Sequence, residues 1–277
     1  MPPRRFSALA VPYCMGDPQP EFAVEDAPPL TATPRGQGAM QRMASILDSV
    51  AAWVAERVPA LVHAPDCMAP IGVVAGLQRA GLDPDLIWLD AHGDFNTPET
   101  TPSGYLGGMP LAMLVGRGDQ SMIRSLGIRP LSERRVVLVG TRDLDPGEAT
   151  ALAASDVRRL SLAELSALPL PYRPLQVHLD LDVVDPDELP GLLYPARGGP
   201  SLAAVATALR HLATAPWIEA VSVAHTYEQS APTTAAGRRA AADLARALAG
   251  GCPPVGSNRC ARSAARWAST LKTPALT

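Results

Sequence analysis

Short apolar segments alternate along the chain with longer amphipathic segments. The apolar segments that we expect to form strands are Phe6–Val11, Ala60–Val62, Leu86–Asp90, Arg135–Gly140, Leu175–Asp182 and Ala220–Val223. The amphipathic segments that we expect to form helices are Gly38–Arg57, Ile71–Ala80, Ser161–Leu168, Ser201–Ala213 and Thr233–Ala249. Continuous apolar strands separated by helices are typical of parallel strands buried on both faces. The pattern therefore predicts a three-layer α/β/α fold, in which ligands bind at the carboxyl ends of the strands.

The composition narrows the class of protein but adds no function. The chain has 277 residues, of which 47% are hydrophobic and 18% charged, and its net charge is -3. We expect one folded domain over residues 1–277, with a core that needs no disulfide or zinc. The slight acidity disfavours nucleic acid or a membrane surface as a partner. No apolar run reaches the ~18 residues of a membrane span, so we expect a cytoplasmic protein.

The first chemical motif follows the apolar segment that begins at Leu86. Asp90, His92 and Asp94 stand at alternate positions after it. In an extended backbone, alternate side chains point to the same side. A single Asp here would be read as a cap or a turn residue. Three potential ligands in alternation instead predict a metal site.

The second motif follows another apolar segment. Asp180 and Asp182 face the same way, and Asp185-Pro186 is typical of a turn. Two carboxylates at a strand end are costly unless a cation or hydrogen bonds compensate their charge. His178 shares their parity but lies deeper, so we interpret it as a hydrogen-bonded core histidine rather than a ligand.

The four aspartates and His92 together suit hard divalent cations, Mn²⁺ in particular. Two such ions side by side can lower the pKa of a shared water and polarise a substrate carbon. The two motifs therefore indicate metal-assisted hydrolysis.

These motifs resemble the ureohydrolase family, which includes arginases and agmatinases. The similarity rests on the Asp-Ala-His-x-Asp stretch at 90–94 and the Asp-x-Asp-x-x-Asp-Pro stretch at 180–186, and it extends over nearly the whole chain. It implies a parallel, eight-stranded sheet between helical layers and a centre of two Mn²⁺ ions. The ligands that it implies are Asp90 and Asp180 bridging the ions, His92 and Asp182 on one ion, and Asp94 on the other.

Two further segments resemble the arginase branch of the family. The run from Asn96 to Ser103 is similar to the segment that binds the substrate α-carboxylate, and it implies that role for Asn96, Thr101 and Ser103. The run at 140–148 is similar to the segment that binds the α-ammonium group, with Asp145 in contact and Glu148 behind it. A decarboxylated substrate would not need the first cluster. The resemblance therefore implies an α-amino acid that carries a guanidine-like group.

Three departures from arginases are visible. Cys67 stands where the family has a metal-binding His, and we interpret it as a ligand, because a nearby dication deprotonates a thiol. Gly107 stands where arginases have the His that shuttles a proton to the leaving amine. His225 stands where they have a Glu that pairs with the guanidinium, unless a shift in the alignment gives that role to Glu228.

Together these departures resemble the branch of the family that hydrolyses Nω-hydroxy-L-arginine to L-ornithine and hydroxyurea in D-cycloserine biosynthesis. A guanidinium stays protonated far above neutral pH, whereas a hydroxyguanidine is less basic and can be bound neutral by a neutral His225. We expect Asp94, with His225 as a second candidate, to carry the proton that the missing His would carry.

Alternative functions remain compatible with the sequence. One is an ordinary arginase or another guanidino-acid amidinohydrolase, and another is a non-catalytic binding protein of the same fold. Soft sulfur at position 67 leans towards zinc or iron, but the family and the hard ligands favour Mn²⁺. The sequence is compatible with a monomer and with a family-type trimer.

Overall fold

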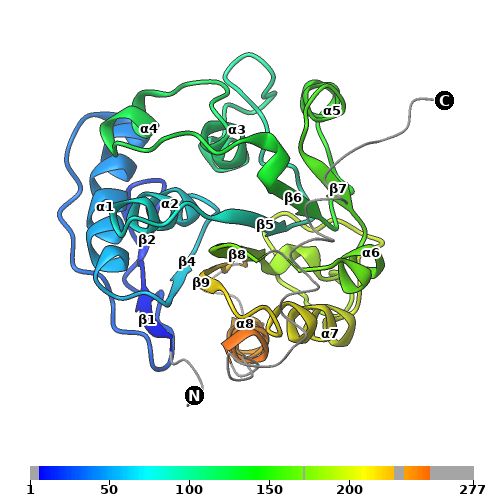
Figure 1. Cartoon of the computed structure of the whole chain (residues 1–277). Coiled ribbons are helices and arrows are strands. Elements are labelled where there is room, and N and C mark those ends of the chain that lie inside the picture. The colour runs from blue at the N-terminus through cyan, green and yellow to red at the C-terminus, as the bar shows by residue number, and fades with distance from the viewer. Residues whose placement is uncertain (1–5, 171, 228–233, 250–277) are drawn as a thin grey trace.

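Seven parallel strands form the central sheet of the computed structural model, which describes residues 6–170, 172–227 and 234–249. In sheet order the strands are β1 (Ser7–Ala10), β4 (Ala60–Ala64), β9 (Ile218–Ala224), β8 (Leu175–Asp180), β5 (Asp85–Leu89), β6 (Val136–Val139) and β7 (Arg158–Leu160). Every neighbouring pair is parallel (Figure 1). Strands β5, β8 and β9 are buried along their whole length, as parallel strands covered on both faces require.

Six of these strands confirm the apolar segments of the sequence. The edge strand β7 was not expected, because its three residues include Arg158 and Arg159 and show no apolar run. An eight-stranded sheet was expected from the resemblance. The described residues contain seven strands in it, so this number differs from the expectation.

Helices cover both faces of the sheet (Figure 1). Their bounds are α1 (Gly38–Ala55), α2 (Ala69–Arg79), α3 (Pro110–Leu114), α4 (Ser121–Ser125), α5 (Pro146–Ala153), α6 (Leu162–Ala167), α7 (Leu202–Leu212) and α8 (Thr234–Ala249). One apolar core joins the sheet to α1–α5 and the other joins it to α6–α8. The three-layer α/β/α expectation is therefore confirmed.

Helices α1 and α2 pack closely because Gly76 has no side chain. A Cβ at this position would lie 2.6 Å from the Cβ of Val54 and 2.8 Å from the carbonyl oxygen of Ala51. The short helices α3, α4 and α5 were not expected from the sequence. Each has eight residues or fewer, which is too short for a clear helical period.

The segment between β1 and α1 lies beside the carboxyl ends of β1 and β9. It begins with a small hairpin of β2 (Tyr13–Cys14) and β3 (Asp17–Pro18). The ring of Phe22 then packs edge-on against His225, with 5.2 Å between the ring centroids. His225 follows the carboxyl end of β9, so this segment lies near the edge at which ligands are expected.

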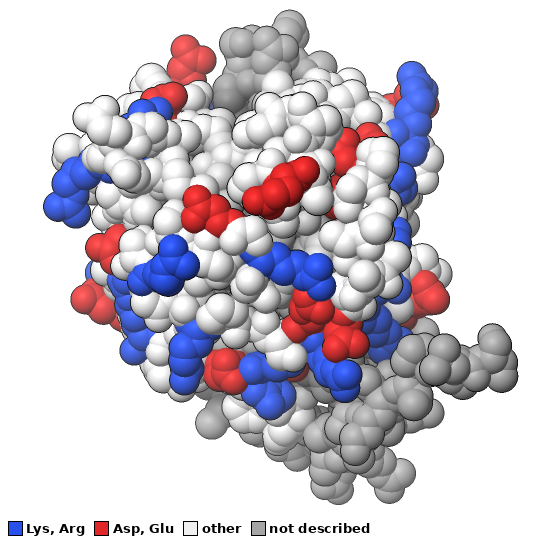
Figure 2. All heavy atoms as spheres, turned by 90° about the horizontal axis from the view of Figure 1, so that it is seen from above, with Lys and Arg blue, Asp and Glu red and all other residues white. Residues whose placement is uncertain are grey.

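Charged side chains are mixed on the face seen in Figure 2, which views the molecule from above Figure 1. Blue arginines alternate there with red aspartates and glutamates, and the described residues form no continuous basic surface on this face. None of the described helices combines the length and the hydrophobicity that a membrane crossing requires. The residues after 250 and Glu228 lie outside the described residues.

Candidate metal centre

The loop after β5 turns sharply around Asp90. The Oδ1 of Asp90 accepts a hydrogen bond from the backbone N–H of His92 at 2.7 Å, and its Oδ2 accepts one from Trp88 Nε1 at 3.0 Å. Asp94 has a φ of +48°, a left-handed conformation that a non-glycine residue rarely adopts. The strained turn holds both carboxylates at the carboxyl edge of the sheet.

The end of β8 brings a second pair of carboxylates to the same place. Asp180 is the last residue of the strand, and its Oδ1 accepts from the backbone N–H of Asp182 at 2.9 Å. The Oδ1 of Asp182 in turn accepts from the backbone N–H of Ala91 at 3.2 Å. Because β5 and β8 are neighbours in the sheet, their ends place all four aspartates beside one another.

His92 and Cys67 complete the cluster. His92 Nδ1 lies 3.1 Å from Asp182 Oδ2 and 3.4 Å from Asp90 Oδ1. Cys67, which follows β4, places its Sγ 2.8 Å from Asp180 Oδ2 and 3.9 Å from Asp90 Oδ2. The structure thus brings together the six residues that the sequence assigned to metal: Cys67, Asp90, His92, Asp94, Asp180 and Asp182.

The charge of this cluster fits divalent cations. Its four aspartates are 1–5% exposed, and among the described residues no Lys or Arg forms an ion pair with them. Burial and neighbouring carboxylates raise the pKa of Asp94 and of Asp180 well above the usual range. Asp94 Oδ2 has no hydrogen-bond partner among the described residues. Buried carboxylates in such number are stable as anions only when cations compensate them.

A cavity of about 450 Å³ opens above the cluster. Its lining also includes the residues expected to bind substrate: Asn96, Thr101, Ser103, Asp145 and Glu148. Two pairs of polar side chains lie at this end: Asn96 Nδ2 donates to Asp145 Oδ2 at 2.9 Å, and Thr101 Oγ1 lies 3.4 Å from Ser103 Oγ. The cavity therefore joins a candidate metal end to a polar end that could bind an amino acid head group.

Glu148 supports this polar end from behind. It is 3% exposed and accepts from the backbone N–H groups of Phe95 at 2.8 Å and Asp145 at 3.3 Å. A Cβ at Gly93 would lie 2.6 Å from its Oε1. Glycine at position 93 is what lets this carboxylate approach the loop after β5.

The space beside Gly107 in the cavity wall is filled by the ring of Tyr105. A Cβ on Gly107 would lie 2.4 Å from a ring carbon of Tyr105, so the tyrosine ring takes the space of a side chain at 107. The ring of Tyr194 lies 5.5 Å from that of Tyr105, and both line the cavity. The sequence identified the glycine but gave no signal that these two tyrosines form the wall.

His225 does not lie where the sequence analysis expected. It is absent from the cavity lining, and its Nε2 lies 2.9 Å from His63 Nδ1 while its Nδ1 lies 3.0 Å from the Tyr227 hydroxyl. Thr226 lines the cavity instead and donates its hydroxyl hydrogen to Asp180 Oδ1. Both side chains are buried, but of the two neighbours only Thr226 lines the cavity.

The geometry and fold define an α/β protein with a candidate divalent-metal centre at the carboxyl edge of its sheet. The sequence profile described as the arginase family matches residues 4–250. The chain belongs to the arginase family, whose members are amidinohydrolases that act on C–N bonds of linear amidines.

Individual relatives agree with this family. The arginase of Bacillus subtilis (strain 168) is 36% identical over 152 residues, which cover 50% of this chain and 51% of the relative. The N(omega)-hydroxy-L-arginine amidinohydrolase of Streptomyces lavendulae is 36% identical over 128 residues, 45% of each chain. The chain thus spans about half the length of the curated relatives that it matches. A crystal structure of Bacillus subtilis arginase superposes with a TM-score of 0.76 at 25% identity, covering 91% of this chain and 100% of that one.

Proposed function

We propose that the protein is a metal-dependent hydrolase that converts Nω-hydroxy-L-arginine to L-ornithine and hydroxyurea. The observation that carries this proposal is the uncharged side chain that follows β9. The resemblance places His225 where arginases have a glutamate for a guanidinium, and among the described residues His225 is absent from the cavity lining, whereas its neighbour Thr226 lines it. A neutral hydroxyguanidine needs no such counter-charge.

Two divalent ions fit the donor set, with Cys67, Asp90, His92, Asp94, Asp180 and Asp182 as the proposed ligands, and the family resemblance favours Mn²⁺. When bound, the ions would supply a water of lowered pKa as the nucleophile and would stabilise negative charge in the transition state. The same residues without metal would be a cluster of buried, mutually repelling carboxylates.

The polar end of the cavity would orient the substrate. Asn96, Thr101 and Ser103 would hydrogen-bond its α-carboxylate, and Asp145, held by Asn96, would bind its α-ammonium group. Fixing both groups would place the hydroxyguanidine at the candidate metal end of the cavity. The substrate side chain would lose conformational entropy in this position.

Asp94 would carry the proton. Water oxygen adds to the guanidine carbon, the bond from this carbon to the alkyl nitrogen breaks, and the departing amine takes up a proton. Oδ2 of Asp94 is buried in the lining without a partner among the described residues, so it can receive the proton of water and deliver it to that nitrogen. The sequence analysis also named His225 for this role. Because His225 is absent from the cavity lining, we assign the transfer to Asp94.

A panel of guanidines tests the proposal. The Mn²⁺-loaded chain is incubated separately with Nω-hydroxy-L-arginine, L-arginine and agmatine, and hydroxyurea, urea and amine products are quantified. We expect hydroxyurea and ornithine from the first compound at a rate well above urea release from the second. Turnover of agmatine alone would refute the amino-acid site.

An ordinary arginase is the second candidate, because the arginase of Bacillus subtilis is as similar in sequence as the hydroxyarginine enzyme. Equal kcat/KM for L-arginine and its Nω-hydroxy derivative would favour this candidate. An Asp94→Asn variant that keeps both metal ions and the full rate would refute the proton transfer while leaving the substrate assignment intact.

A further inference from the structure

His178 is a buried histidine with one unsatisfied nitrogen beside the candidate centre. It lies on β8, two residues before Asp180, and is 0% exposed. Its Nδ1 lies 3.0 Å from the Oγ of Ser222 on β9. Its Nε2 has no hydrogen-bond partner among the described residues. A core histidine ordinarily satisfies both nitrogens, because a buried polar atom without a partner loses its hydrogen bonds to water and gains none in exchange.

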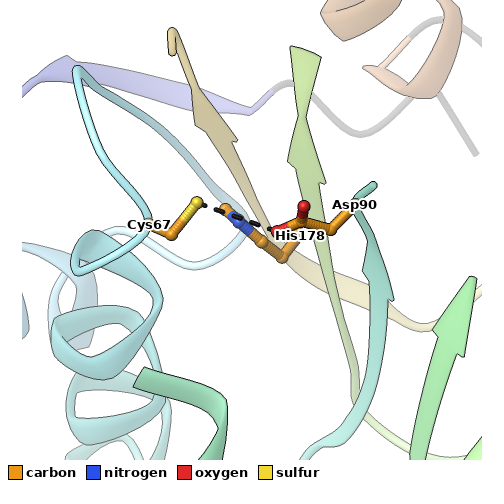
Figure 3. A group of neighbouring side chains, drawn as sticks. All are labelled: Cys67, Asp90 and His178. Carbon is orange, nitrogen blue, oxygen red and sulfur yellow. Dashed lines mark hydrogen bonds between the residues drawn. The ribbon is translucent and has the colours of Figure 1, made fainter. Parts of the chain in front are cut away.

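The unsatisfied nitrogen belongs to a compact set of donors. A ring nitrogen of His178, the Sγ of Cys67 and a carboxylate oxygen of Asp90 all lie within 4.8 Å of one another. Ser222 engages Nδ1, so Nε2 is the nitrogen left for this set. Figure 3 shows the three side chains converging from β8, from the loop after β4 and from the end of β5.

Packing fixes the imidazole in this position. The ring of Trp88 lies 4.1 Å from the ring of His178, and the Trp88 indole N–H donates to Asp90 Oδ2. The hydrogen bond to Ser222 sets the rotation of the imidazole from the other side. A histidine with one nitrogen bonded in this way and the other directed at acidic and sulfur donors has the arrangement of a metal-binding histidine.

We propose that His178 is a metal ligand and that Cys67, Asp90 and His178 form one of the two metal positions. The proposal rests on the metal dependence inferred under Proposed function. The other position contains Asp90, His92 and Asp182, whose donor atoms also lie within 4.8 Å of one another. Asp90 is common to both sets and would bridge them.

The two positions differ in chemical character. A thiolate, an imidazole and a carboxylate form a donor set that favours Zn²⁺ or Co²⁺, whereas the position of Asp90, His92 and Asp182 has no sulfur and is better suited to Mn²⁺. The centre would therefore be asymmetric, with a softer ion beside Cys67 and His178. Such a centre differs from one that contains two equivalent Mn²⁺ ions.

Cobalt binding by the full chain tests the assignment with a spectroscopic readout. The metal-free protein is titrated with Co²⁺, and the thiolate-to-cobalt charge-transfer band, identified by its loss in Cys67→Ser, reports the position beside Cys67. His178→Phe keeps a ring against Trp88 but removes both nitrogens. We expect this variant to bind Co²⁺ at that position at least tenfold more weakly, in the range seen when groups that support a metal site are removed.

Two further variants separate the outcomes. His211→Gln alters a half-buried histidine on α7 whose Nε2 lies 3.2 Å from the backbone carbonyl oxygen of Leu168, and it should leave the band unchanged. His178→Gln, with the metal-induced rise in Tm as its readout, covers the case in which the Phe variant does not fold. An unchanged Co²⁺ affinity and band in both His178 variants would show that His178 is a core residue. Failure of the wild-type chain to bind any divalent ion would instead refute the metal-dependent function itself.

Discussion

The missing side chain at position 107 decides how the cavity wall is built. Tyr105 fills the space beside Gly107, and its ring contacts Tyr194, which in turn lies 6.3 Å from the ring of His92. Burial is the main cause that raises the pKa of the Tyr105 phenol, so this group stays neutral. Among the described residues, the part of the cavity wall beside position 107 is therefore formed by the two neutral aromatic rings of Tyr105 and Tyr194.

Replacing Gly107 by Ala tests this coupling. The new Cβ must displace the Tyr105 ring, so we expect kcat/KM for Nω-hydroxy-L-arginine to fall about tenfold, or ~1.4 kcal/mol. Gly108→Ala is the matched control, since a Cβ there would have 4.0 Å to its nearest neighbour. In a Tyr105→Ala background, Gly107→Ala should cost little more. Equal losses for the two glycine variants would contradict the close packing.

At the scale of elements, the order of the strands in the sheet determines which residues meet at the site. Strands β4, β9, β8 and β5 are consecutive in the sheet, so the loops that follow them meet at one edge. Beneath this edge His63 of β4 and His225 after β9 form a buried pair, with 2.9 Å between the facing nitrogens. Burial lowers the pKa of both imidazoles, to about 4 for His63. Both imidazoles are therefore neutral in the folded protein at neutral pH.

This pair predicts a loss of stability in acid. A histidine with a pKa near 6.5 in the unfolded chain and about 4 in the folded one binds more protons when unfolded, so stability falls as the pH decreases through that window. From pH 7 to pH 5 we expect His63 to contribute a loss of about 2 kcal/mol. Urea unfolding of wild type and His63→Gln at both pH values measures it. Identical pH dependence of the two proteins would contradict the neutral pair.

Sequence patterns predicted the strands and the longer helices because apolar periodicity is a local property. The proposed metal ligands Asp90, His92, Asp180 and Asp182 could also be predicted from the sequence, since alternation along a strand fixes the side to which their side chains point. Tyr105 and Thr226 escaped prediction, because their exposure depends on turns whose geometry no local pattern reveals. His178 was interpreted as a core residue, and only the nitrogen that Ser222 leaves unsatisfied distinguishes it.

At the scale of the whole molecule, the candidate centre lies where β4, β5 and β8 end, at one edge of the central sheet. Its proposed ligands come from the segments after β4 and β5 and from the end of β8, and the carboxylates repel one another wherever cations do not compensate them. Both hydrophobic cores reach these strands, one from each face. Metal binding should therefore stabilise the entire fold.

Metal removal tests this expectation. A ligand at 100 times its Kd that binds only the folded state adds about 2.7 kcal/mol of stability. We expect dialysis against a chelator to lower Tm by several degrees, and added Mn²⁺ or Zn²⁺ to restore it. Asp182→Asn should show a smaller metal-induced rise than wild type. A Tm that is insensitive to chelator and metal would contradict a metal centre formed by these residues.

A competition assay tests the central claim most directly. Equimolar Nω-hydroxy-L-arginine and L-arginine are given together to the metal-loaded chain, and the initial ratio of hydroxyurea to urea reports the ratio of the two kcat/KM values. The uncharged lining at Thr226 predicts a ratio well above one, with L-ornithine released in equal amount to the sum of both ureas. A ratio at or below one would contradict the account, because the cavity would then favour the guanidinium cation.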